Sequence, residues 1–277
     1  MTFINKLICL IVIPLFTLQY SPLFLVAKLF NEPTEPTSIS EGNLENVKLV
    51  AHRGGTTEAP ENSLPAFRSA IEKNYYAAEC DIIRTKDGRW VISHDDEAFK
   101  HFFSFGKISE MTFDEARELK YSFDTNFWLY QDEKIPTLEE YLDLFVGKST
   151  RAMIELKTDT LEGLEDVVKA IDERNLNENV IIISFYIESL RKVAKLNPQL
   201  EMWYLVRGID DENIAEAKSL PNCTGISADN GFNDADSIKL AIDNGFDVAI
   251  WTIDSVKKAE KFNDMGAEYI VTNKLGY

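Results

Sequence analysis

Short apolar runs alternate with helix-like stretches from Val47 to the end of the chain, and this alternation constrains the fold more than any other feature. The runs are rich in Val, Ile or aromatic residues, as parallel strands covered on both faces should be. The predicted strands are Val47–His52, Ala78–Ile83, Arg151–Leu156, Val180–Ser184, Glu201–Val206, Thr224–Ser227, Asp247–Thr252 and Tyr269–Val271.

Helical stretches, with apolar residues spaced about 3.6 positions apart, separate most of these strands. Eight strand–helix units over about 230 residues predict an α/β fold, the (β/α)8 TIM barrel. A doubly wound open sheet is the alternative. The chain stops at Tyr277, so we expect the eighth helix to be short or missing. The predicted helices are Ser63–Lys73, Leu161–Arg174, Ile187–Leu196, Asn213–Leu220, Asp236–Asn244 and Val256–Met265.

The longest interval between predicted strands, residues 83–150, indicates an insertion after the second strand. It begins with a hairpin that turns at Lys86-Asp87-Gly88, and helices follow at Thr112–Lys120 and Thr137–Phe145. Because loops at the C-terminal end of a barrel carry function, we expect this insertion to cap the mouth. Its aromatic residues predict either a packed cap or a lipid-binding surface. They are Phe99, Phe102, Phe103, Phe105, Phe127, Trp128 and Tyr130.

The N-terminal region differs in character from the rest of the chain. Leu7–Ala27 contains no charged residue and is long enough to cross a bilayer as a helix. An uncleaved signal anchor, a cleaved signal peptide and a buried helix remain open for residues 1–30, before a polar linker over 31–45 and the barrel domain over 46–277. Lys6 before the run, with acid-rich sequence after it, predicts an extracytoplasmic domain, secreted or attached to the membrane by its N-terminal segment.

The net charge of −17, from 46 acidic and 29 basic residues, restricts the partners of this chain. Such a surface repels nucleic acid, so we expect no nucleic-acid partner. An anionic small molecule would need local positive charge, which a bound divalent cation can supply. The three cysteines show no disulfide framework, and the sequence does not indicate an oligomeric state.

Three carboxylates fall on predicted barrel strands. Glu79 and Asp81 lie two positions apart, so both side chains should face the barrel interior, and Glu155 should join them from the next strand. Buried carboxylates need compensation, either from a divalent cation or from Arg and Lys partners. A cluster of oxygen ligands suits Ca²⁺ or Mg²⁺ rather than Zn²⁺.

Two histidines lie at the ends of predicted strand segments: His52 is the last residue of Val47–His52, and His94 directly follows the hairpin segment Trp90–Ser93. His52 and His94 suit a general base and a general acid near neutral pH. His101 has no strand before it, and we expect it to be non-catalytic. Arg53 can grip a phosphate through two donors, and Lys157 can bind one as a point charge or simply pair with Glu155.

A set of short motifs, in this order, resembles the glycerophosphodiester phosphodiesterase family over about Val47 to Asn273. Each motif alone is weak, but the ordered set is specific. The motifs are His52-Arg53-Gly54, Ala59-Pro60-Glu61-Asn62-Ser63, Glu79-Cys80-Asp81, Asp87-Gly88, Ser93-His94-Asp95, Ile135-Pro136-Thr137-Leu138-Glu139-Glu140, Glu155-Leu156-Lys157 and Trp251-Thr252-Ile253-Asp254.

The resemblance implies a TIM barrel related to phosphatidylinositol phospholipase C, and hydrolysis of glycerophosphodiesters to sn-glycerol 3-phosphate and an alcohol. It implies one divalent cation, Ca²⁺ or Mg²⁺, and an aromatic residue near the glycerol. The implied metal ligands are Glu79, Asp81 and Glu155; the acid–base pair is His52 and His94; the substrate-binding residues are Arg53, Lys157 and Trp251.

Two alternatives remain beside this function. One is a phospholipase C- or D-type enzyme that cleaves lipid substrates on a similar barrel. The other is a catalytically silent barrel that binds glycerophosphodiesters. The chain also departs from the family pattern after Asp95: residues 96–106 lack the Arg and the Gly-rich turn that often occur there, which leaves the details of substrate recognition open.

Overall fold

The computed structural model describes residues 35–41, 44, 46–122, 127–158 and 161–277. The predicted N-terminal segment, residues 1–30, lies outside this part of the chain. Within the described ranges, no helix combines the length and the apolar character that crossing a membrane requires.

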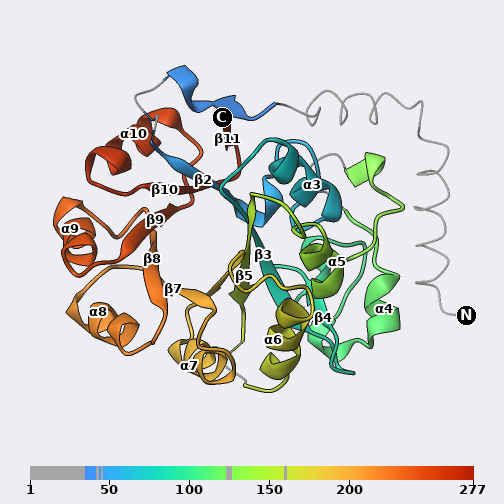
Figure 1. Cartoon of the computed structure of the whole chain (residues 1–277). Helices are drawn as coiled ribbons and strands as arrows, with labels where there is room; N and C mark the ends of the chain where they lie inside the picture. The colour runs from blue at the N-terminus through green and yellow to red at the C-terminus, as the bar shows by residue number, and fades with distance from the viewer. Residues whose placement is uncertain (1–34, 42–43, 45, 123–126, 159–160) are drawn as a thin grey trace, which may run out of the picture. The chain divides into compact units, whose positions relative to one another are not determined.

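Eight parallel strands close into a barrel (Figure 1). They are β2 (Lys48–Ala51), β3 (Ala77–Arg84), β5 (Arg151–Leu156), β6 (Val180–Ser184), β7 (Glu201–Val206), β8 (Cys223–Asp229), β9 (Asp247–Trp251) and β10 (Tyr269–Thr272). Their order is β2-β10-β9-β8-β7-β6-β5-β3, and pairing between β2 and β3 closes the ring. The predicted TIM barrel is therefore confirmed, and the open sheet is excluded.

Helices lie outside the strands (Figure 1). They are α3 (Leu64–Glu72), α5 (Leu138–Asp143), α6 (Leu164–Asp172), α7 (Ile187–Leu196), α8 (Asp211–Lys218), α9 (Ala235–Asp243) and α10 (Val256–Asp264). Side-chain caps start several of them: the Ser63 hydroxyl accepts a bond from the Ala66 amide, and Thr137 forms a capping box with Glu140.

Alternate strand residues point into the barrel and out toward the helices, as the period of two requires. On β5, Met153 belongs to the interior cluster, whereas Ile154 packs in the layer between strands and helices. Trp203 fills the N-terminal part of the interior, where its ring meets Tyr269 edge-to-face at 4.7 Å. Side chains therefore close the N-terminal end of the barrel, and any ligand site must lie at the other end.

The insertion begins with the predicted hairpin, in which β4 (Trp90–Ile92) pairs antiparallel with the end of β3. A short helix, α4 (Phe113–Arg117), and three 3-10 turns, η4 (Ala98–Lys100), η5 (Ile108–Glu110) and η6 (Phe127–Leu129), follow. They enclose a small apolar cluster of their own that includes Val91, Phe102 and Tyr121. Of the aromatic residues named above, Phe102 is buried, whereas Phe99, Phe103 and Phe105 are 52%, 53% and 88% exposed.

A short strand, β11 (Leu275–Gly276), follows β10 in place of an eighth helix. It pairs in parallel with β1 (Thr37–Ser38), which lies within the segment that we predicted to be linker. Next in the chain, the Tyr277 hydroxyl accepts a hydrogen bond from the Leu49 amide at 2.7 Å, so the C-terminus is tied to the first barrel strand.

Candidate active site

The three predicted carboxylates converge at the C-terminal end of neighbouring strands. Glu79 and Asp81 lie on β3 and Glu155 on β5, with Asp81 and Glu155 directly opposite each other in the strand register. Each residue offers one oxygen, and these oxygens lie within 4.8 Å of one another. Glu79 and Asp81 are only 2% and 1% exposed, so their charges are removed from bulk water.

The environment of Glu79 leaves negative charge uncompensated. Glu79 Oε2 accepts a bond from the Arg53 amide at 2.8 Å, but the buried Oε1 has no hydrogen-bond partner. Burial, with the charges of Asp81 and Glu155, raises the pKa of Glu79 well above its ordinary value. Burial and Asp81 likewise raise the pKa of Glu155 to about 7. An unpartnered oxygen within three converging carboxylates fits a hard divalent cation.

Two basic side chains share this cluster. Lys157 Nζ lies 3.3 Å from Asp81 and 3.2 Å from Glu155, and Arg53 Nε lies 3.6 Å from Asp81. Burial alone would raise the pKa of Asp81, but Lys157 and Arg53 together hold it below its ordinary value. The ion pairs that we weighed as an alternative to a metal are therefore present at Asp81 and Glu155, although they leave Glu79 Oε1 unpartnered.

His52 follows β2 directly and is oriented by Asn273. Its Nδ1 lies 2.8 Å from Asn273 Oδ1, while Asn273 Nδ2 donates to Asp254 Oδ2 at 3.1 Å. Because the amide nitrogen faces a carboxylate, the amide oxygen faces the imidazole, so Nδ1 carries the proton and Nε2 presents a lone pair. Burial, assisted by Arg53, lowers the pKa of His52 to about 4.

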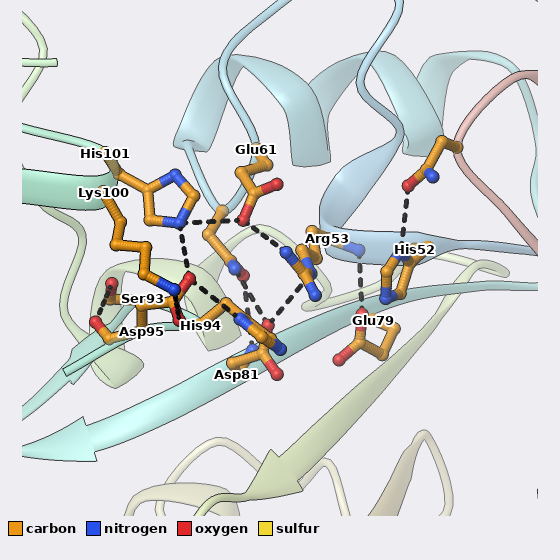
Figure 2. Close-up of polar contacts among 12 residues, drawn as sticks. His52, Arg53, Glu61, Glu79, Asp81, Ser93, His94, Asp95, Lys100 and His101 are labelled. Carbon is orange, nitrogen blue, oxygen red and sulfur yellow. Dashed lines mark hydrogen bonds and ion pairs between the residues drawn. The ribbon is translucent and has the colours of Figure 1, made fainter. Parts of the chain in front are cut away.

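His94 lies two residues beyond β4 and is oriented by a carboxylate instead of an amide. Its Nδ1 lies 3.2 Å from Asp95 Oδ2, so the proton again sits on Nδ1 (Figure 2). Burial lowers the pKa of His94, while the nearby charge of Asp81 opposes that shift. His101, for which we expected no catalytic role, also reaches Asp95 Oδ2, at 3.0 Å.

A tight backbone turn brings His52 and Arg53 to the carboxylates. Arg53 has a left-handed φ of 53° and Gly54 a φ of 87°. A Cβ on Gly54 would lie 2.8 Å from the Ala66 side chain, so only glycine fits there. Asn62, also left-handed, donates to Asp81 Oδ2 at 2.9 Å and fixes this carboxylate from the first loop.

One cavity of about 140 Å³ joins these groups at the barrel mouth. Apolar side chains form part of its wall, where Phe185 meets Trp251 edge-to-face at 5.8 Å. The buried Trp251 Nε1 has no hydrogen-bond partner. Seven of the eight predicted site residues line the cavity, and the eighth, Asp81, forms ion pairs with two of them, Arg53 and Lys157. The seven are His52, Arg53, Glu79, His94, Glu155, Lys157 and Trp251.

Several polar residues that hold the site were not among the predicted site residues. Asn273 and Asp254 orient His52, while Glu61 accepts a bond from Arg53 Nη1 at 2.7 Å. The sequence motifs quoted above could have identified three of these residues as part of the site, because they contain Glu61, Asn62 and Asp254. Nothing in the sequence around Asn273 or His101 indicated their contacts.

Residues 52–277 match the model of the glycerophosphoryl diester phosphodiesterase family. A glycerophosphodiester phosphodiesterase from Caldanaerobacter subterraneus subsp. tengcongensis is 31% identical over 236 residues, which cover 81% of this chain and 93% of that protein. One from Bacillus subtilis is 27% identical, with coverage of 87% and 89%.

This chain also resembles solved phosphodiesterase structures in its fold. An Oleispira antarctica phosphodiesterase in complex with the product sn-glycerol-3-phosphate has a TM-score of 0.73 and 25% identity, and the match covers 86% of this chain and 96% of that one. The match to the family model and the similarity to its members confirm the resemblance and the enzyme class that the motifs implied: the chain belongs to the glycerophosphoryl diester phosphodiesterase family.

Proposed function

We propose that this site hydrolyses glycerophosphodiesters to sn-glycerol 3-phosphate and an alcohol, with a divalent cation, Ca²⁺ or Mg²⁺, held by Glu79, Asp81 and Glu155. The observation that carries this proposal is the convergence of three buried carboxylates and two histidines on one cavity. The product named in the Oleispira antarctica complex supports the same substrate class.

The cation, Lys157 and Arg53 would together supply the positive charge that stabilises the anionic phosphate. When bound, the cation supplies Lewis-acid stabilisation of the phosphoryl oxygens. Lys157 and Arg53 line the cavity and now neutralise Asp81 and Glu155. With these carboxylates occupied as ligands, both basic groups could turn their donors to the phosphate, Arg53 through two of them.

The two histidines differ in their partners, and this difference assigns their roles. His52 pairs with a neutral amide, so its Nε2 remains a lone pair that can accept the proton of an attacking hydroxyl. His94 pairs with the Asp95 carboxylate, which stabilises an imidazolium that can protonate the leaving oxygen. We therefore propose His52 as the base and His94 as the acid.

The attacking hydroxyl is proposed to be the 2-hydroxyl of the substrate's own glycerol. His52 accepts its proton as the new P–O bond closes a cyclic phosphate, and the bond to the alcohol breaks as His94 donates a proton to the departing oxygen. Water then opens the ring with the two histidines in exchanged roles, which gives sn-glycerol 3-phosphate. Trp251 and Phe185 form the apolar wall on which the glycerol carbons can pack.

Product analysis tests this function. The purified protein, incubated with glycerophosphocholine and either Ca²⁺ or Mg²⁺, should release sn-glycerol 3-phosphate, whereas His52→Ala and His94→Ala should each lower kcat by at least about 100-fold. Release of phosphocholine, or cleavage of intact phospholipid alone, would favour a phospholipase-type reaction instead. Near-wild-type turnover in both variants would refute the acid–base assignment.

We also propose an extracytoplasmic location, on the basis of the charge pattern around Leu7–Ala27. The segment itself lies outside the described residues. In spheroplasts, added protease should degrade the barrel domain without lysis. Protection of the intact domain by the cytoplasmic membrane would contradict this proposal.

A further inference from the structure

His101 lies between two carboxylates of the site, those of Asp95 and Glu61. Its Nε2 lies 3.0 Å from Asp95 Oδ2, the same oxygen that lies 3.2 Å from His94 Nδ1 (Figure 2). The same Nε2 lies 3.5 Å from Glu61 Oε1, which accepts a bond from Arg53. The imidazole of His101 thus contacts two carboxylates. One is Asp95, which orients the proposed general acid His94, and the other is Glu61, which pairs with the proposed phosphate-binding residue Arg53.

Asp95 needs such a partner in order to hold a single orientation. Its other oxygen contacts Lys100 Nζ at 3.1 Å, but the Lys100 side chain is 48% exposed, and ion pairs of this kind hold geometry weakly. The His101 side chain is only 17% exposed, and its ring is rigid. His101 is therefore the contact better able to stop the Asp95 carboxylate from turning away from His94.

The backbone around His101 is held independently of its side chain. Ala98 and Phe102 on either side are 1% and 3% exposed and belong to the apolar cluster of the insertion. The His101 carbonyl accepts a hydrogen bond from the Ser122 amide at 2.9 Å. Replacing the imidazole should therefore leave the fold of the insertion intact.

We propose that His101 is a positioning residue that fixes Asp95 against His94, so that Nδ1 of His94 stays bonded to Asp95 and Nε2, which gives up the second proton of the imidazolium, faces the substrate. This inference rests on the proposed function. It predicts an effect on turnover more than on substrate binding, because Arg53 contacts Glu61 directly at 2.7 Å, whereas His101 lies farther from the same oxygen, at 3.5 Å.

Steady-state kinetics on glycerophosphocholine provide the first test. His101→Ala should lower kcat about 10- to 100-fold while KM changes by less than about threefold, as for partners that orient a catalytic group. His101→Gln, which keeps an N–H donor at a similar position, should recover most of the loss. Lys100→Gln, which removes the exposed contact to the same carboxylate, is the matched control and should change kcat by less than about twofold.

A double mutant separates positioning from general structural damage. If His101 acts through Asp95, adding His101→Ala to Asp95→Asn should cause little further loss beyond that of Asp95→Asn alone. Independent, multiplied losses in the double mutant, or wild-type kcat in His101→Ala, would overturn the proposal.

Nitrogen NMR provides a test that does not require activity, because the chain has only three histidines. In ¹⁵N-histidine-labelled protein at a pH where His94 is neutral, its proton should lie on Nδ1, and His101→Ala should shift it toward a mixture of tautomers. An unchanged His94 tautomer would overturn the inference. Wild-type protein that hydrolyses no glycerophosphodiester would refute the proposed function instead, and the spectra would still decide the role of His101.

Discussion

Asn273 Oδ1 accepts a hydrogen bond from His52 Nδ1 at 2.8 Å, across a sequence separation of 221 residues. The contact exists because β10, which precedes Asn273, pairs with β2, which precedes His52, where the barrel closes. Asp254 fixes Asn273 twice, through the backbone amide at 2.7 Å and the side-chain amide at 3.1 Å. Closure of the fold thus determines which nitrogen of the proposed base faces the substrate.

Replacing Asn273 with Ala should lower kcat about 10-fold or more, because His52 loses the partner that orients it. Asn273→Asp should act differently: a carboxylate would stabilise the imidazolium and raise the pKa of His52 from about 4. The neutral base would then be lost at higher pH, so the acidic limb of the pH profile of kcat/KM should move upward. The profile is to be measured at saturating metal, and an unchanged acidic limb would argue against His52 as the base.

Removing the charge of Glu79 should separate stability from metal binding. Glu79→Gln keeps an acceptor for the Arg53 amide but removes a carboxyl group whose ionisation is unfavourable in this buried acidic cluster, so the metal-free protein should be stabilised by about 1 kcal/mol. The same variant should bind Ca²⁺ or Mg²⁺ far more weakly. Thermal unfolding with and without cation measures both effects. A variant less stable than the wild type in chelator would show that Glu79 is already compensated.

Cation binding should release protons at mildly acidic pH, since the pKa of Glu155 is raised to about 7 in the metal-free site. Only the ionised carboxylate of Glu155 can bind the cation. The affinity for the cation should therefore fall as pH drops below about 7, by up to about tenfold per pH unit. In chelator, the raised pKa makes a contribution to stability that is lost as pH rises from 4.5 toward 7. Calorimetric titrations in buffers of different ionisation enthalpy measure the protons released. Affinity that is flat across this window would contradict the prediction.

Gly225 is predicted to matter for stability at the closed end of the barrel. A Cβ there would lie 2.5 Å from the Trp203 ring, which is fully buried and cannot move aside easily. Gly225→Ala should therefore destabilise the fold by about 1–3 kcal/mol. Gly208→Ala is the matched control, because its Cβ would meet neighbours only at 3.6 Å or more. The two melting temperatures should differ by several degrees, and equal values would mean that the barrel end is loosely packed.

The convergence of the three carboxylates was predictable from sequence because it depends on the geometry of neighbouring strands. Residues two apart on one strand share a face, so Glu79 and Asp81 had to point the same way, and the neighbouring strand placed Glu155 opposite Asp81. The barrel itself followed from the repeated strand–helix pattern, since buried parallel strands and amphipathic helices have distinct periods.

The supporting contacts were not predictable in the same way. The contact between Asn273 and His52 depends on how the barrel closes, which no local pattern encodes. His101 lies in an insertion of short turns without periodicity, so its approach to Asp95 and Glu61 depends on tertiary packing around Phe102 and Tyr121. The sequence predicted His101 to be non-catalytic, which remains compatible with a positioning role.

We propose that hydrolysis depends on a divalent cation held by Glu79, Asp81 and Glu155. The most direct measurement is the release of sn-glycerol 3-phosphate from glycerophosphocholine by protein stripped with chelator and then titrated with Ca²⁺ or Mg²⁺. We predict that the stripped protein is inactive and that activity returns as one cation binds per chain, but not in Glu155→Gln. Full activity in the stripped protein would contradict this dependence on a cation.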